Sequence, residues 1–82
     1  MQIVWDEPKR RQNIAKHGLD FASLTLEFFE TASIDAARQN RLLAVGELDG
    51  VAIVAVIFRP LGSEALSVIS MRRASRSERS RR

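Results

Sequence analysis

The sequence predicts a small α+β protein in which helical patterns come first and strand patterns follow. Apolar residues in the first 30 positions of the 82-residue chain recur at helical spacing, whereas short apolar runs separated by turn residues begin near Thr31. A capping motif close to the C-terminus predicts a short last helix. The simplest arrangement packs two N-terminal helices on one face of an antiparallel sheet, within a single domain spanning residues 1–82.

The N-terminal region contains residues that begin and end helices. Gln2 to Trp5 predicts a short strand, and the acidic residues before Pro8 favour the first turn of a helix. This helix is predicted to reach about His17 and to end at Gly18, the usual residue for a left-handed C-terminal cap.

A second helix is predicted to begin at Asp20, whose side chain suits the N-cap position. Phe21, Leu24 and Phe28 follow at helical spacing and define one apolar face, which should enter the core. Residues Ala32 to Ala36 are then compatible with an edge strand.

The clearest local pattern is a β-hairpin. Apolar runs from Arg41 to Leu48 and from Val51 to Phe58 flank Asp49-Gly50, a dipeptide that favours a two-residue type I′ turn. With that turn, paired residue numbers sum to 99. The face predicted to lie under the helices then carries Leu42, Ala44, Gly46, Leu48, Val51, Ile53, Ala55 and Ile57. Small residues in its middle should let the helices approach closely.

The opposite face of this hairpin is also mostly apolar, although one face of an antiparallel sheet often meets water. It is predicted to carry Arg41, Leu43, Val45, Glu47, Ala52, Val54, Val56 and Phe58. A further layer is therefore expected over it, supplied by the C-terminal segment, a second copy or another protein.

The C-terminal part is predicted to form one more strand and a short helix. Pro60 and Gly62 mark a turn, and Ala65 to Met71 reads as the last strand. Ser75 and Glu78 match a capping box, so a helix should begin near Ser75.

Composition excludes several classes of site and compartment. The chain has no cysteine, which excludes a disulfide, a thiolate zinc site and a cysteine nucleophile. Its one histidine and its acidic residues show no metal-ligand spacing, and no cofactor motif is present. The longest apolar run, Val51 to Phe58, is far shorter than the ~18 residues of a membrane span, and the N-terminus lacks a signal-peptide layout. A cytoplasmic protein is expected.

The net charge of +3 conceals an asymmetry along the chain. Residues 1–71 hold 7 basic and 9 acidic side chains, whereas residues 72–82 hold 6 basic and 1 acidic. The six are Arg72, Arg73, Arg76, Arg79, Arg81 and Arg82. Because arginine matches phosphate oxygens two at a time, this arginine-rich segment favours a nucleic-acid surface, with RNA as the preferred polyanion. A solvated tail that maintains solubility is the alternative.

The candidate catalytic residues are Lys16, His17, Arg72 and Arg73. Arg72 and Arg73 follow the apolar stretch of the last strand, where fixed guanidinium groups would suit the charge that develops on phosphate oxygens during RNA cleavage. His17 is a candidate acid or base if it faces that end of the sheet, and Lys16 would assist it. Residues 76, 79 and 81 are candidate RNA-binding arginines.

Each of these residues also has a plain structural interpretation. His17 and Lys16 would interact favourably with the negative end of a helix dipole in its last turn. The two strand-end arginines would bind phosphate without chemistry, and Glu78 would act as a capping residue rather than a base.

Several segments together resemble the BrnT toxins, a family of the RelE-like superfamily. The matching segments are Val4-Trp5-Asp6, Asn13 ahead of Lys16-His17-Gly18, Phe21 and Phe28, a strand carrying Gly46, and Ile69 to Ser75 with Glu78-Arg79 beyond. The resemblance spans nearly the whole chain, and its motifs around His17 and Arg72 are specific in combination.

The resemblance implies a bacterial type II toxin, a ribosome-independent endoribonuclease that cleaves RNA without a metal or cofactor and inhibits translation. It also implies a cognate BrnA-like antitoxin that folds against the toxin, inhibits it and contributes DNA binding for autorepression. A homodimer and a toxin–antitoxin heterotetramer both remain open. Two other functions also remain open: a non-catalytic module that binds RNA or an antitoxin, and a purely structural interaction protein.

Overall fold

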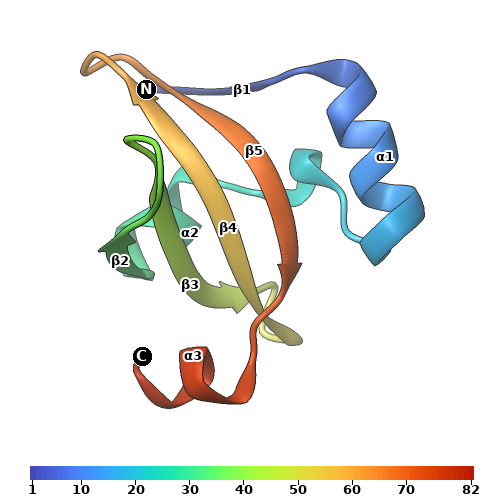
Figure 1. Cartoon of the computed structure of the whole chain (residues 1–82), viewed down its shortest axis with the longest axis vertical. Helices are drawn as coiled ribbons and strands as arrows, with labels where there is room; N and C mark the ends of the chain where they lie inside the picture. Colours follow the sequence, from blue (N-terminus) through green and yellow to red (C-terminus); the bar gives the residue numbers. More distant parts are fainter.

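The fold is described by a computed structural model that covers residues 1–82. Along the chain the elements are β1 (Gln2–Trp5), α1 (Glu7–His17), the 3₁₀ turn η1 (Phe21–Ser23), α2 (Leu26–Thr31), β2 (Ser33–Ala36), β3 (Leu42–Leu48), β4 (Ala52–Leu61), β5 (Ala65–Arg73) and α3 (Arg76–Ser80). Figure 1 shows them in one view. The predicted α+β class, with N-terminal helices on a sheet and a short C-terminal helix, is confirmed.

The five strands form one sheet in the order β1-β5-β4-β3-β2. Strands β2 to β5 are antiparallel neighbours, as the runs of apolar residues and turns indicated. β1 adds to the outer edge of β5 in parallel, with Gln2 opposite Ala65. The sheet is therefore mixed rather than wholly antiparallel, a detail that local patterns do not encode because the two strands lie at opposite ends of the chain.

The first helix has the ends that its sequence predicts. The Asp6 side chain accepts a hydrogen bond from the backbone N–H of Lys9, and Pro8 occupies the first turn. Gly18 adopts a φ of 69°, and its N–H bonds the carbonyl of Ile14. A glycine is favoured there because a left-handed conformation is costly for other residues.

The second predicted helix is divided in two. Asp20 does cap the segment that follows it, but that segment is only the 3₁₀ turn η1. α2 then starts afresh at Leu26, because Thr25 is extended and its hydroxyl accepts from the N–H of Phe28 at 3.2 Å. The three predicted core residues of this region, Phe21, Leu24 and Phe28, are all buried.

The hairpin turns where it was predicted to turn, but its register is shifted. Asp49 and Gly50 have φ values of 53° and 68°, and the N–H of Val51 bonds the carbonyl of Leu48, as a type I′ turn requires. Pairing then begins between Leu48 and Ala52, so that paired numbers sum to 100 rather than 99. Val51 is an extra residue, 87% exposed, that the alternating pattern does not distinguish from a strand residue.

This shift moves every β4 side chain to the other face, because side chains alternate along a strand. The predicted positions of Ala44 and Gly46 on the core face are correct, but the segment of η1 and α2 covers that face without α1. The predictions for β4 are wrong: Val54, Val56 and Phe58 enter the core, whereas Ile53, Ala55 and Ile57 lie on the opposite face. Both faces of β4 are apolar, so composition could not reveal the error.

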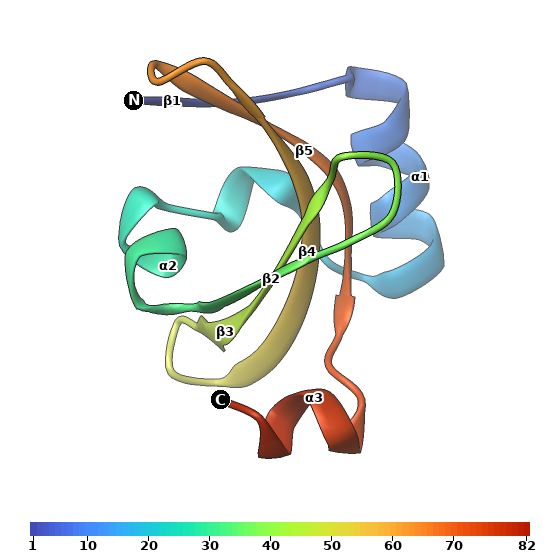
Figure 2. The same cartoon turned by 60° about the vertical axis from the view of Figure 1, so that its left-hand side comes forward.

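The core lies between the inner face of the sheet and the segment containing η1 and α2 (Figure 2). Its buried residues are Phe21, Leu24, Phe28, Ala44, Val54, Val56, Phe58, Leu66, Val68 and Met71. α2 packs closely on β3, since a Cβ built on Gly46 would lie 3.1 Å from atoms of Phe28 and Ala32. α1 contributes no residue to this core, so its position has another basis.

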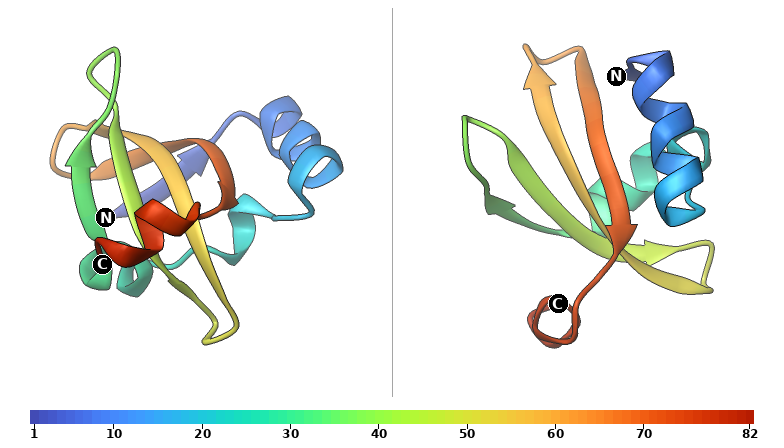
Figure 3. Two further views of the ribbon diagram at one scale, coloured as in Figure 1. Left: turned by 60° about the horizontal axis from the view of Figure 1, so that its bottom comes forward. Right: turned by 45° about the vertical axis from the view of Figure 1, so that its right-hand side comes forward.

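The C-terminal segment crosses the outer face of the sheet. The N–H of Ala74 bonds the carbonyl of Ile53, and further along, Arg81 lies 3.7 Å from Asp35 of β2. Figure 3 shows α3 passing in front of the strands when the molecule is seen from below. Val45 and Ala55, which point to this face, are 3% and 1% exposed. The C-terminal segment therefore approaches this side of the sheet, but most of its own residues are exposed, so the predicted covering layer stays a prediction.

Candidate functional site

α1 lies beside β5, at the edge of the sheet that β1 leaves open (Figure 1). One buried side chain fixes it there. The Oδ1 atom of Asn13 accepts a hydrogen bond from the N–H of Met71 at 3.0 Å, and its Nδ2 atom donates to the carbonyl of Leu19 at 2.9 Å. Asn13 is 6% exposed, and it joins the helix to both the strand edge and the turn after Gly18.

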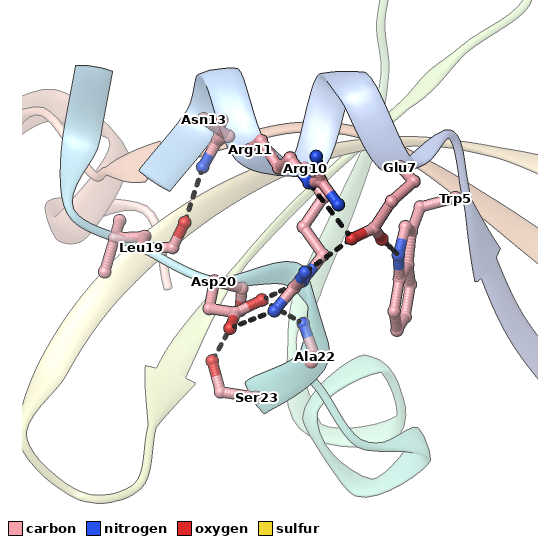
Figure 4. A network of polar contacts seen from close by, with 9 residues as sticks. All are labelled: Trp5, Glu7, Arg10, Arg11, Asn13, Leu19, Asp20, Ala22 and Ser23. Atoms are coloured by element: carbon pink, nitrogen blue, oxygen red, sulfur yellow. Dashed lines mark hydrogen bonds and ion pairs between the residues drawn. The ribbon is translucent and has the colours of Figure 1, made fainter. Parts of the chain in front are cut away.

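The carboxylates near α1 are held by two of its arginines and by Trp5. The guanidinium of Arg10 bonds Asp20 at 2.8 Å and Glu7 at 2.7 Å, and Arg11 lies 3.6 Å from Glu7 (Figure 4). The indole N–H of Trp5 is the main cause that lowers the pKa of Glu7, and Arg10 lowers the pKa of Asp20. These carboxylates are therefore charged and already paired.

A cleft of about 280 Å³, called the α1 cleft from here on, opens between α1 and β5. It is lined by Lys9, Gln12, Asn13, Lys16, His17, Arg41, Ile69 and Ser70. The five helical residues recur at the spacing that forms one face of a helix, and in a core-facing helix that face would be apolar. No acidic residue lines the cleft, so its positive charges are not neutralised within it.

Two of the predicted catalytic residues, Lys16 and His17, lie together in the α1 cleft. Arg41, just before β3, completes it and was not singled out from the sequence. Its Nε atom is the one buried side-chain nitrogen or oxygen without a hydrogen-bond partner. An unpaired buried donor costs about 1–3 kcal/mol. The polar stripe along α1 is the signal that could have located this cleft.

The two other predicted catalytic residues lie outside the cleft lining. β5 extends through Arg73, two residues beyond the predicted end, and Arg72 and Arg73 pair with Ala55 and Val54. Arg72 consequently points to the outer face, as Ser70 does, whereas Arg73 points the other way and is exposed. Ser70 links the two regions, because it lines the cleft and lies two residues before Arg72.

Arg72 is engaged with the C-terminal helix. Its two terminal nitrogens donate to both oxygens of Glu78, at 2.7 and 2.9 Å. Glu78 also accepts from the N–H of Ser75, which completes the predicted capping box. The arginine is the main cause that lowers the pKa of Glu78 to about 2, and the carboxylate in turn raises the pKa of Arg72.

The three predicted RNA-binding arginines, Arg76, Arg79 and Arg81, are exposed along α3 and its end. Of these three, only Arg81 forms an ion pair, with Asp35 of β2 at 3.7 Å. A larger hollow of about 610 Å³ lies at the turn between β3 and β4, but its lining has three carboxylates, Glu27, Glu47 and Asp49, against one arginine, Arg82. Such a lining disfavours a polyanion, whereas the α1 cleft and α3 present positive charge.

The basic lining of the α1 cleft suits an anionic ligand. No three histidine or carboxylate side chains are grouped so that they could hold a metal ion. No helix is both long and apolar enough to cross a bilayer. The cations of the α1 cleft, by contrast, are the groups that proteins use to bind phosphate.

Comparison with known proteins agrees with this chemistry. A family described as the ribonuclease toxin, BrnT, of type II toxin–antitoxin systems matches residues 5–78. A crystal structure of the Brucella abortus ribonuclease toxin BrnT is 63% identical and superimposes with a TM-score of 0.88, covering 93% of this chain and 99% of that one. Comparison with curated proteins gave no match. The chain belongs to the BrnT family of ribonuclease toxins of type II toxin–antitoxin systems.

Proposed function

We propose that this toxin is a ribosome-independent and metal-independent endoribonuclease that cleaves RNA and thereby inhibits translation. The observation that carries the proposal is the α1 cleft, which holds His17 and Lys16 and has no carboxylate in its lining. A polyanionic substrate meets no charge repulsion there, and the imidazole of His17 is a candidate general acid or base.

RNA cleavage without a metal makes three chemical demands. The 2′-hydroxyl must lose its proton, the charge on the phosphorane must be neutralised, and the leaving 5′-oxygen must gain a proton. We assign one of the proton transfers to His17, and we assign charge neutralisation to Lys16 and to Arg72, which points to the same face as Ser70 of the cleft. Arg73 points to the other face at the exposed end of β5, and we assign it to a neighbouring phosphate. Arg72 has five N–H groups and Glu78 binds two of its nitrogens, so donors remain for a phosphate.

The path of the RNA follows from the direction of β5. Ser70 and Arg72 point to the same face and lie about 7 Å apart along the strand. An RNA strand in the α1 cleft would therefore pass over Ser70 to Arg72 and then to α3. Arg76, Arg79 and Arg81 would bind its next phosphates through charge, without reading sequence.

The test is cleavage of a single-stranded RNA by the purified toxin, with and without a chelator. We expect cleavage to be unchanged by the chelator. The variants His17→Ala, Arg72→Ala and Arg73→Ala should each cleave about 10²- to 10³-fold more slowly, because each loses a preorganised group. Loss of cleavage on chelation would disprove metal independence, and full activity of all three variants would disprove the assignment.

We further propose that a BrnA-like antitoxin is the cognate partner and that the pair acts in the cytoplasm, where the RNA substrate is. A type II toxin has such a protein partner. Light scattering on the purified toxin and on the toxin with antitoxin distinguishes the two assemblies considered, a toxin homodimer and a toxin–antitoxin heterotetramer. A strictly monomeric toxin in a one-to-one complex would exclude both.

A further inference from the structure

Arg41 is the feature of the α1 cleft that the proposed chemistry leaves unused. It precedes β3 and comes from a part of the chain remote from both α1 and the arginine-rich C-terminal segment. Its Nε atom is buried and has no hydrogen-bond partner. Arg41 itself lines the cleft and forms no ion pair within the chain, so its charge is available for a ligand there.

The surroundings of Arg41 define what that ligand would be. Lys9 and Lys16 line the same cleft, and no carboxylate does. Of the acidic residues near α1, Glu7 and Asp20 are paired with Arg10, and Asp6 caps the helix by accepting from the backbone N–H of Lys9. Four basic side chains, counting His17, therefore face a space with no internal counter-charge, which favours an anion.

The size and shape of the space narrow the choice of anion. The cleft of about 280 Å³ is at the lower end of ligand pockets and holds one sugar–phosphate unit rather than a duplex. Gln12 and Ser70 add neutral hydrogen-bonding groups at its walls. Because the Nε atom is buried, the terminal nitrogens of the Arg41 guanidinium are the donors left for a ligand, and their planar fork matches two phosphate oxygens.

We infer that Arg41 is a substrate-binding residue that holds a backbone phosphate of single-stranded RNA in the α1 cleft. This inference rests on the proposed function for its substrate, but it concerns binding and not the bond-breaking step. Arg41 would fix the position of the phosphate against the α1 wall, where Lys16 and His17 lie. The register of the RNA relative to His17 would then depend on Arg41 more than on the arginines of α3.

The experiment measures the affinity of a fluorescent 2′-O-methyl oligoribonucleotide, which binds as RNA does but has no free 2′-hydroxyl and cannot be cleaved. Arg41→Ala should weaken binding by about tenfold or more, as expected for loss of a charge-assisted hydrogen bond. Arg41→Lys should also weaken binding, because lysine keeps the charge but loses the fork. Arg11→Ala, which removes an exposed arginine facing Glu7, is the matched control and should bind as the wild type does.

Urea unfolding of the same variants separates binding from stability. Because the Nε atom has no partner in the free protein, Arg41→Ala should leave the unfolding midpoint unchanged or raise it. Wild-type affinity in Arg41→Ala would overturn the inference even if RNA is cleaved. Weakened binding in Arg41→Ala, with a wild type that never cleaves RNA, would support the inference and overturn the proposed nuclease activity.

Discussion

The α1 cleft and the arginine-rich C-terminal segment are both basic, but they carry their charge differently. The segment from residue 72 to residue 82 has six arginines and one acidic residue, the highest charge density in the chain. Arg72 of this segment is nevertheless bound by Glu78 through two hydrogen bonds. The α1 cleft has fewer cations, drawn from two distant parts of the chain, and no carboxylate among them.

This difference shows that the position of the carboxylates matters as much as the number of arginines. On α1, Arg10 and Arg11 hold Glu7, and Arg10 also holds Asp20, so that Lys9 and Lys16 remain unpaired. In the C-terminal segment the single glutamate orients a strand-end arginine. Charge counts along the sequence thus predict the class of ligand, whereas the pairing pattern is the basis on which we propose where it binds.

Charge reversal should separate the two regions most strongly. Lys16→Glu places a carboxylate in the α1 cleft, and we expect kcat/KM for RNA cleavage to fall about 100-fold or more. Arg79→Glu changes the net charge by the same amount on exposed α3, and we expect a loss of about tenfold or less. Single-turnover cleavage at one fixed salt concentration measures both. Equal losses would mean that the cleft has no special role.

Loss of the Asn13 side chain should have the next largest effect, and the quantity affected is the free energy of unfolding rather than the rate of RNA cleavage. Asn13→Ala leaves the N–H of Met71 and the carbonyl of Leu19 without partners, which should lower the free energy of unfolding by about 2–3 kcal/mol. Gln12→Ala, on the same wall but exposed, should change it by about 0.5 kcal/mol or less. Urea titrations provide the comparison, and similar values for the two variants would show that α1 is anchored in another way.

Removal of the Glu78 charge tests what orders the C-terminal segment. Glu78→Gln should destabilise the protein by about 1–2 kcal/mol at neutral pH, a modest value because Arg72 is partly exposed. Pairing lowers the pKa of Glu78 from 4.5 to about 2 in the folded protein. The contribution of this carboxylate to the free energy of unfolding is therefore complete above pH 4.5 and is lost as the pH falls towards 2. The difference between variant and wild type should shrink over that range. A pH-independent difference would contradict the role of the charge.

The smallest effect should come from the exposed arginines of α3, and it should appear in the salt dependence of binding. Replacement of Arg76, Arg79 and Arg81 by alanine should reduce the log–log slope of RNA affinity against salt by about 0.7 for each phosphate that the variant no longer binds. Arg11→Ala should leave the slope unchanged. If the triple variant keeps the wild-type slope, these arginines do not bind RNA phosphates, and the alternative of a solvated tail that maintains solubility is favoured.

Features set by short-range rules could be predicted from the sequence. Gly18, the turn at Asp49-Gly50 and the capping box at Ser75 all lie where the pattern placed them, because each depends on the backbone geometry of a few adjacent residues. The register of the hairpin could not be predicted. One extra residue, Val51, decides it, and an apolar side chain at that position gives no local sign that it is exposed.

The candidate site was predictable only in part, for a related reason. Lys16 and His17 were singled out, and both lie in the α1 cleft. Arg41 was missed because its neighbours in space come from α1 and β5, and nothing next to it in the sequence indicates them. The engagement of Arg72 by Glu78 was missed because the capping box alone explained why a glutamate is there.

The hydrogen bond between Asn13 and Met71 joins residues that are 58 positions apart in the sequence. β1 likewise can pair only with β5, a strand from the other end of the chain. Ribosomes extend a chain from its N-terminus, and contacts between distant residues form late in folding. A nascent chain therefore carries the residues of α1 long before it carries the strand against which they are arranged. The α1 cleft cannot exist until β5 has been made, so the polypeptide acquires the surface assigned to its substrate only after both walls of the cleft have been synthesised.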